Sequence, residues 1–233
     1  FLLGTPCLVR YMELLHRESL KSTTPNMSFV YLERKASQPN APLLLLLHGY
    51  GSNDADLFSF AAYIPNSFHV VSLQAPLRIS GDSYAWFPIY FSESMERWTS
   101  PDEVKKATDY ISEFLGYYVA KHPIDSEKIY LMGFSQGAML SYSIGLTMEK
   151  VKGIAALSGY IDPRMVEINN SYIPSIYVSH GTADTVVPYA WAEQSIELLK
   201  TNGFQPEFYA YPQGHGISQD NLNSVIQWLQ AQL

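Results

Sequence analysis

The chain has 233 residues, and its 15 lysine and arginine residues against 22 aspartate and glutamate residues give a formal net charge of −7. This acidic balance argues against binding to nucleic acid or to an anionic membrane surface. Hydrophobic residues make up 47% and aromatic residues 14% of the chain, which excludes global disorder. The length and composition together predict a single domain over residues 1–233 with one large core.

The first residues of the chain are largely apolar, and one interpretation is that they are the remnant of a targeting segment. Residues 1–11 precede Met12 and lack both a cationic start and an Ala-x-Ala cleavage site, so we expect them to be disordered or foreign to the native chain. The longest aliphatic run covers only residues 43–47, which is too short to span a bilayer. The single cysteine, Cys7, excludes an intrachain disulfide and a multi-cysteine metal site. We expect a cytoplasmic protein without integral membrane association.

Short runs of strand-forming residues recur along the chain and predict eight strands. The first two are expected to pair as a hairpin around residues 24–26, and the inner runs are continuously apolar, as in strands buried on both faces. The expected strands cover residues 12–20, 27–34, 43–47, 68–73, 128–132, 151–157, 175–179 and 207–211.

Helical segments lie between these strands. Ser100-Pro101-Asp102-Glu103 has the pattern of a capping box and predicts a helix that ends before Pro123. Further helices are expected over residues 138–147 and 189–201 and from about residue 218 onward. The alternation of strands and helices predicts an α/β fold with a mostly parallel sheet covered on both faces. Ligands bind such sheets at the carboxyl ends of the strands.

A serine stands at the carboxyl end of one of these strands, in Gly133-Phe134-Ser135-Gln136-Gly137. A serine between a strand and a helix requires a sharp turn, and the flanking glycines leave room for it. The turn exposes the hydroxyl at the N-terminus of the helix, where developing negative charge is stabilised. The pattern and its context predict that Ser135 is a catalytic nucleophile.

A serine hydroxyl needs a base and an orienting acid, which follow it in the order acid, then histidine, in this architecture. His215 follows the last expected strand between two glycines, and we predict that it is the base. Asp184 follows the strand over residues 175–179 and is the favoured acid. Asp162 is the rival acid, although its place before Pro163 is well explained by a turn.

Two backbone amides are expected to stabilise the oxyanion. One belongs to Gln136, the residue after the nucleophile, and the other to Tyr50 in the glycine-containing loop after the strand over residues 43–47. His48 and His180 are expected to be buried, hydrogen-bonded anchors of their loops. The other histidines are scattered, so no metal site is predicted.

An aromatic loop over residues 84–91 connects the strand over residues 68–73 to the helix that begins at Pro101. One interpretation is that its rings pack in the core. The other is that Trp86 and Phe87 overhang the serine and bind substrate, with Trp86 as one wall of the acyl pocket. Both interpretations are open at this point, because loops of this length are often functional and the rings can serve both purposes.

From about residue 43 to its end, the chain resembles the phospholipase/carboxylesterase family of α/β-hydrolases, which includes acyl-protein thioesterases and small bacterial carboxylesterases. The resemblance rests on motifs at residues 47–51, 85–87, 133–137, 157–160, 180–184, 187–188 and 214–215. It implies an α/β-hydrolase fold, a Ser135/Asp184/His215 triad, oxyanion amides at Tyr50 and Gln136, no cofactor, and ester or thioester substrates.

These observations predict a serine carboxylesterase that hydrolyses short- to medium-chain acyl esters of small molecules through an acyl-enzyme. An acyl-protein thioesterase or lysophospholipase with a longer acyl channel would use the same machinery. A non-catalytic ligand receptor on a hydrolase scaffold is the alternative from another class, since a fold does not fix a function. Homodimerisation is plausible because only 16% of the residues are charged and 17 are tyrosine.

Overall fold

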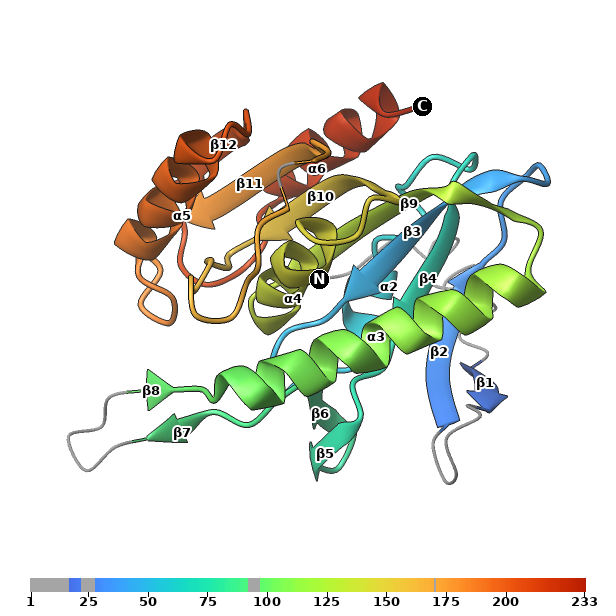
Figure 1. Cartoon of the computed structure of the whole chain (residues 1–233), viewed down its shortest axis with the longest axis horizontal. Helices are drawn as coiled ribbons and strands as arrows, with labels where there is room; N and C mark the ends of the chain where they lie inside the picture. The colour runs from blue at the N-terminus through green and yellow to red at the C-terminus, as the bar shows by residue number, and fades with distance from the viewer. Residues whose placement is uncertain (1–16, 22–27, 92–96, 170) are drawn as a thin grey trace.

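An eight-stranded sheet forms the centre of the computed structural model, which describes residues 17–21, 28–91, 97–169 and 171–233 (Figure 1). Six neighbouring strands of this sheet run parallel to one another, and the next strand is antiparallel to the strands on both of its sides. The mostly parallel sheet predicted from the sequence is therefore confirmed. In spatial order the strands are β1 (Arg17–Lys21), β2 (Ser28–Arg34), β4 (His69–Leu73), β3 (Ala41–Leu47), β9 (Ile124–Phe134), β10 (Val151–Leu157), β11 (Ser175–Gly181) and β12 (Glu207–Tyr211).

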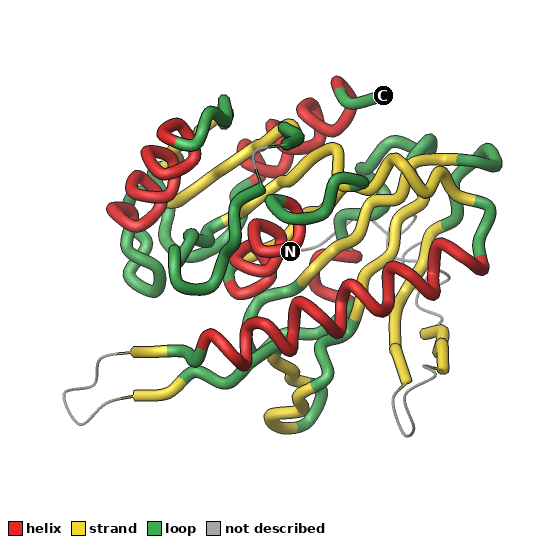
Figure 2. The backbone as a smooth tube through the Cα atoms, in the orientation of Figure 1, coloured by secondary structure: helices red, strands yellow, loops and turns green. Residues whose placement is uncertain are grey.

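Helices cover both faces of this sheet (Figures 1 and 2). The long β3 strand shows why, because it is apolar at every position from Leu43 to Leu47 and successive side chains point to opposite faces. Alternate leucines of β3 join two separate hydrophobic clusters, one on each face. The first cluster includes α3 (Pro101–Lys121), α4 (Gln136–Gly145) and α5 (Tyr189–Thr201), and the second includes α2 (Ala55–Phe58) and α6 (Gln219–Ala231). Among the residues described, no helix is long and apolar enough to cross a membrane.

Two small antiparallel sheets were not predicted. They consist of β5 (Leu77–Ser80) with β6 (Ser83–Ala85), and of β7 (Tyr90–Phe91) with β8 (Arg97–Trp98), and they lie between β4 and α3 in the chain (Figure 2). All four side chains of β5 are exposed, so this strand has no buried face to produce an alternating pattern. The expected turn over residues 24–26 and the segment before Arg17 lie outside the described residues.

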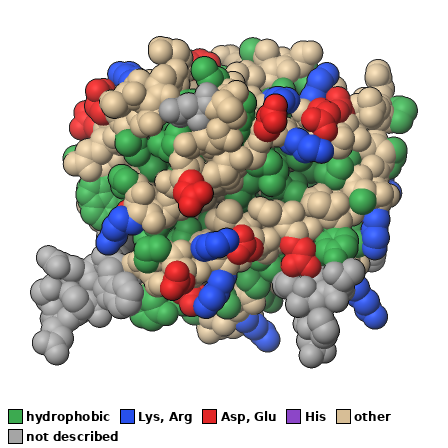
Figure 3. Space-filling view, in the orientation of Figure 1, with side chains coloured by type: hydrophobic (Ala, Val, Ile, Leu, Met, Phe, Trp, Pro, Cys, Tyr) green, Lys and Arg blue, Asp and Glu red, His purple; other side chains and the backbone are tan. Residues whose placement is uncertain are grey.

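The helix α3 begins at Pro101 as predicted, but its capping box does not form. Ser100 is the N-cap residue, yet its side chain makes no capping hydrogen bond, and its carbonyl accepts from the Glu103 amide at 3.1 Å instead. The Glu103 carboxylate pairs with Lys106 at 2.8 Å instead of completing the cap. The face in Figure 3 shows such positive and negative side chains close to one another rather than in large patches of one sign.

The parallel strands bring four predicted site segments to one edge of the sheet. Ser135 directly follows β9, and the loop over residues 48–51 directly follows β3. Asp184 stands three residues after β11, and His215 stands four residues after β12. Because these four strands are parallel, their carboxyl ends share an edge, and the side chains that follow them can meet there.

Gly137 is the position where the turn after β9 leaves no space for a side chain. A Cβ atom there would overlap the carbonyl groups of Leu47 and His48, which are backbone atoms and cannot swing away. We expect Gly137→Ala to lower the free energy of unfolding by about 3 kcal/mol, the upper end of the usual range for overpacking. Gly116→Ala on the exposed side of α3 is the matched control and should raise stability by roughly 0.5–1 kcal/mol, since nothing lies near its Cβ. Urea unfolding of both variants measures the difference, and equal effects would contradict the expectation.

Candidate active site

Ser135 occupies a strained turn between β9 and α4. Its φ of 53° and ψ of −113° lie outside the ordinary regions for a side-chain-bearing residue. The turn is fixed because the Ser135 amide donates to the Leu157 carbonyl at 2.9 Å and the glycines on either side are closely packed. This geometry places the hydroxyl at the N-terminus of α4 and above the sheet edge, where a substrate can reach it.

His215 lies between Ser135 and Asp184. Its Nε2 is 3.0 Å from the Ser135 Oγ, and its Nδ1 is 2.7 Å from Asp184 Oδ2. An ionised carboxylate can only accept, so Nδ1 carries the proton and Nε2 is left as the acceptor for the serine hydroxyl. The ring of Phe134 packs beside the imidazole at 4.9 Å between centroids. The structure thus brings together three residues that are far apart in the sequence.

The Asp184 carboxylate is completely buried yet remains ionised. Burial by itself raises the pKa of Asp184, but hydrogen bonds from His215 and from the Val187 and Val186 amides outweigh it and hold the pKa below its ordinary value. Its Oδ1 accepts from these two amides at 2.9 and 2.8 Å. One oxygen therefore anchors the loop, and the other orients the imidazole.

The rival acid, Asp162, does not contact His215. Both of its oxygens are taken by Arg164, whose Nε and Nη2 donate at 3.0 and 2.6 Å. This guanidinium holds the pKa of Asp162 below its ordinary value. Asp162 also accepts from the Arg164 amide at 2.9 Å, which is the turn role that its place before Pro163 suggested.

The histidine loop depends on a residue that the sequence did not single out. The Gln213 side chain donates to the Gly216 carbonyl at 2.6 Å and accepts from the Ser218 amide at 3.1 Å, so it closes the loop around His215. The Gln213 carbonyl accepts from the Ala183 amide at 3.0 Å and ties this loop to the Asp184 loop. No sequence pattern assigns such a role to a glutamine in a loop.

The segments that carry the two predicted oxyanion amides both border Ser135. Gly49 is packed against the Ser135 turn, because a Cβ on it would come within 3.4 Å of the Ser135 Cβ, and this brings the Tyr50 segment beside the hydroxyl. The Gln136 amide is the first of α4 and has no acceptor within the helix. The Gln136 side chain bridges to the aromatic loop, accepting from the Trp86 amide at 2.9 Å and donating to the Phe87 carbonyl at 2.8 Å.

His48 and His180 are fully buried loop anchors. The His48 Nδ1 donates to the Gly49 carbonyl at 2.8 Å, and its Nε2 accepts from the Ala75 amide at 3.1 Å. Burial is the main cause that lowers the pKa of His48, so the ring stays neutral. The His180 Nε2 donates to the Val187 carbonyl at 2.8 Å and supports the loop that holds Asp184.

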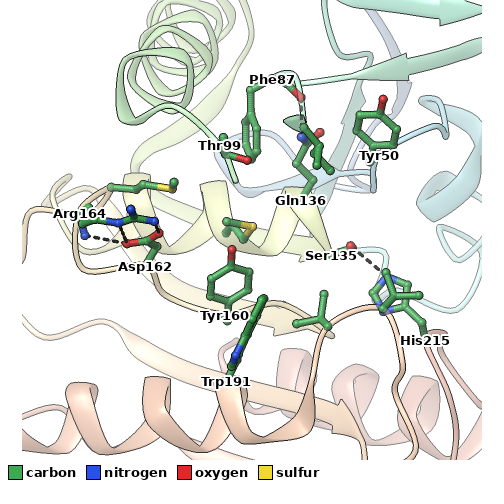
Figure 4. A pocket seen from close by; sticks show the side chains of 15 residues that line it. Tyr50, Phe87, Thr99, Ser135, Gln136, Tyr160, Asp162, Arg164, Trp191 and His215 are labelled. Atoms are coloured by element: carbon green, nitrogen blue, oxygen red, sulfur yellow. Dashed lines mark hydrogen bonds and ion pairs between the residues drawn. The ribbon is translucent and has the colours of Figure 1, made fainter. Parts of the chain in front are cut away.

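A cavity of about 310 Å³ opens at Ser135 (Figure 4). Its wall is largely apolar, with a charged pair formed by Asp162 and Arg164 on the side away from His215. The lining residues are Tyr50, Phe87, Ile89, Thr99, Ser135, Gln136, Met139, Tyr160, Asp162, Arg164, Met165, Val186, Val187, Trp191 and His215. Within the described ranges, no group of three or more histidine, cysteine, aspartate or glutamate residues is arranged to hold a metal ion.

The two aromatic residues predicted to bind substrate have different surroundings. Phe87 lines the cavity and Trp86 does not, although both side chains are almost fully buried. The Trp86 indole donates to the His48 carbonyl at 2.8 Å and its ring packs near the imidazole of His48. Trp86 therefore supports the loop after β3 from behind instead of forming a wall of the pocket, because its N–H finds a buried partner there.

Trp86→Phe should lower kcat/KM for acetate, butyrate and hexanoate esters by a similar factor. The substitution keeps a ring but leaves the His48 carbonyl without its donor, which should lower the free energy of unfolding by about 1–3 kcal/mol. Phe87→Ala is the comparison, since it enlarges the cavity and should change the dependence on acyl length. Steady-state kinetics with p-nitrophenyl esters and a melting curve measure both effects. A loss confined to the longer esters in Trp86→Phe would restore the pocket-wall hypothesis.

Comparison with known proteins agrees with this architecture. A profile of the phospholipase/carboxylesterase family matches residues 32–233. Acyl-protein thioesterase 1 of Debaryomyces hansenii is 28% identical over 214 residues, which cover 83% of this chain and 92% of that protein. A probable carboxylesterase of Oryza sativa subsp. japonica is 32% identical over 158 residues, covering 64% of this chain and 58% of that protein.

Solved structures give the same result. The crystal structure of esterase PE8 superposes with a TM-score of 0.77 at 29% sequence identity, over 86% of this chain and 97% of that one. The Bacillus cereus carboxylesterase also reaches a TM-score of 0.77, at 21% identity over 91% of this chain and 97% of that one, and supports the α/β-hydrolase fold. The chain therefore belongs to the phospholipase/carboxylesterase family and is a hydrolase of the esterase and acyl-protein thioesterase type.

Proposed function

We propose that the protein is a serine carboxylesterase that hydrolyses short- to medium-chain acyl esters through an acyl-enzyme. The observation that carries the proposal is the hydrogen-bonded series from Asp184 through His215 to Ser135, with distances of 2.7 and 3.0 Å. Both distances lie within hydrogen-bond reach, which is the geometry that activation of a nucleophile by a base requires.

In the proposed mechanism, the Ser135 Oγ attacks the acyl carbonyl while His215 takes the hydroxyl proton on Nε2. Asp184 stabilises the resulting imidazolium and keeps Nδ1 protonated. The oxyanion lies between the amides of Tyr50 and Gln136, each worth about 3 kcal/mol of transition-state stabilisation. His215 then gives its proton to the leaving alkoxide, and water activated by the same imidazole releases the acid.

The size of the cavity supports short- to medium-chain acyl groups. Its volume of about 310 Å³ is at the lower end of the range of about 300–1,000 Å³ for small-molecule sites. The apolar side chains beside Ser135, such as Met139 and Val187, suit an alkyl chain. The charged Asp162–Arg164 pair on the far side would oppose a long alkyl tail, since moving apolar groups against charges strips the charges of water.

Acyl-protein thioesterase activity is the second candidate, because relatives at 28% identity carry that name. A thioester would use the same three side chains, and the acyl part would occupy the same cavity. The two candidates differ in the leaving group, which is an alcohol for the esterase and a thiol for the thioesterase.

A panel of p-nitrophenyl esters from acetate to palmitate tests the proposal, together with a fluorophosphonate label and matched acyl thioesters. We expect labelling at Ser135 and the highest kcat/KM between butyrate and octanoate. Labelling with a preference for palmitoyl thioesters would favour the thioesterase. Absence of both labelling and hydrolysis in the folded protein would leave a receptor on a hydrolase scaffold.

A further inference from the structure

The cavity at Ser135 ends in an ion pair that ester hydrolysis alone does not need. Asp162 and Arg164 lie on the side of the cavity away from His215 (Figure 4). The Asp162 carboxylate is buried, with a side-chain exposure of 9%, whereas the Arg164 side chain is 70% exposed. The rest of the cavity wall is mostly apolar, with Met139 and Trp191 among its members. The cavity therefore combines an apolar middle with a charged end.

The turn at Asp162 does not explain the position of the guanidinium. The hydrogen bond from the Arg164 amide to Asp162 completes the turn without any help from the arginine side chain. The two side-chain bonds to Asp162 instead fix the plane of the guanidinium at the cavity wall. In the described part of the chain this side chain hydrogen-bonds to Asp162 alone. Since a guanidinium has five N–H donors, several are left for a ligand.

The direction of the reaction identifies which part of the ester meets this pair. His215 must protonate the leaving alkoxide, so the alcohol departs on the His215 side of Ser135. The acyl chain then extends to the other side, where Arg164 stands (Figure 4). An acyl chain that reaches the end of the cavity meets a guanidinium rather than an apolar wall.

We propose that Arg164 binds a carboxylate at the far end of the acyl chain, so that half-esters of dicarboxylic acids are the preferred substrates of this site. The inference rests on the proposed esterase function. A planar guanidinium pairs with a carboxylate through two parallel N–H···O bonds, a match that a lysine or a hydroxyl cannot provide. Asp162 positions the arginine for this contact and offsets part of its charge.

Matched pairs of p-nitrophenyl esters test the proposal. Each half-ester of glutarate, adipate, pimelate or suberate is compared with the monoester of the same carbon number that ends in methyl, and spontaneous hydrolysis is subtracted. We expect the wild-type protein to have the higher kcat/KM for the half-ester, with a maximum at one chain length, because a fixed arginine meets one length best. A constant or absent preference across the series would overturn the proposal.

Three variants separate recognition by Arg164 from an unrelated structural effect. Arg164→Gln should lower the ratio of kcat/KM values, half-ester over methyl-ended ester, by about tenfold or more, as expected for a lost bond between charged groups. Lys152→Gln removes the same charge from an exposed position of β10 outside the cavity lining and should leave the ratio unchanged. Asp162→Asn keeps one oxygen that can accept from the Arg164 guanidinium and hold it in place, but removes the competing negative charge, so it should raise the ratio.

In Arg164→Gln the Asp162 carboxylate loses its partner, and this unpaired charge could itself repel a substrate carboxylate. The double variant Asp162→Asn/Arg164→Gln removes that charge, and its ratio of kcat/KM values should also be low. The proposal would be contradicted if Arg164→Gln lowered kcat/KM equally for the half-ester and the methyl-ended ester, or if Asp162→Asn lowered the ratio of the two values. Hydrolysis of the methyl-ended esters and labelling of Ser135 report on the esterase function itself. A failure of the substrate preference is therefore distinguishable from a failure of the proposed activity.

Discussion

Ser135→Ala is expected to fold like the unaltered chain and to lose ester hydrolysis by a factor of about 10³ or more. The hydroxyl is the only group that the substitution removes, while the backbone bond to Leu157 and the packing of the flanking glycines are kept. Residual hydrolysis would come from the oxyanion amides and from binding alone.

Burst kinetics with a p-nitrophenyl ester and fluorophosphonate labelling measure this effect, and circular dichroism with a melting curve verifies the fold. Ser143→Ala is the matched control, because Ser143 is not among the cavity-lining residues and its hydroxyl donates only to backbone carbonyls, those of Met139 at 3.2 Å and Met165 at 3.4 Å. Retention of most activity in Ser135→Ala would assign the nucleophile to another residue.

Asp184→Asn should lower kcat by about 10⁴, because the amide can donate to Nδ1 and so favour the tautomer whose Nε2 carries a proton and cannot accept from Ser135. The factor by which Asp162→Asn lowers kcat should be smaller than that of Asp184→Asn by about a hundredfold or more, since Asp162 contacts Arg164 and not the imidazole. Both substitutions remove one negative charge near the cavity, so each serves as the charge control for the other.

The pH dependence of stability gives a further expected result for Asp184→Asn. The pKa of Asp184 is below its ordinary value in the folded protein, so the stability that this shift contributes is present above the unfolded-state pKa and is lost as the pH falls through the folded one. Asp184→Asn should therefore be less stable than the unaltered chain at neutral pH, and the gap should narrow in acid. Similar kcat values for the two variants, or a greater loss in Asp162→Asn, would transfer the orienting role to Asp162.

The sequence was most informative where a local pattern determines the conformation. The inner strands of the large sheet are visible as apolar runs, and the Ser135 turn is visible because glycines must flank it. Asp162 and Asp184 have similar sequence surroundings, because both follow a strand and both precede a proline closely. Only the three-dimensional arrangement shows that the imidazole lies against Asp184.

Contacts between distant or irregular segments were beyond sequence analysis. Nothing in the order Ala85-Trp86-Phe87 indicates which ring faces the cavity, since that depends on where the indole finds an acceptor, here the His48 carbonyl. The Arg164 side chain lies at the cavity because of an ion pair within an irregular loop, and no sequence periodicity predicts such a contact. The short α2 and β5 elements have too few residues to form a recognisable pattern.

β12 is an edge strand of the sheet, so local unfolding of this strand is enough to disrupt the site. Among the strands that the structure describes, β12 pairs with β11 alone, and three of its five side chains are exposed. The free energy of local unfolding is lower for such an edge strand than for a central strand. If β12 detaches, the imidazole departs with it, while the serine stays in place on the central β9. Mild denaturant should therefore abolish turnover before it melts the molecule, so the working lifetime of the protein is governed by one strand and not by its core.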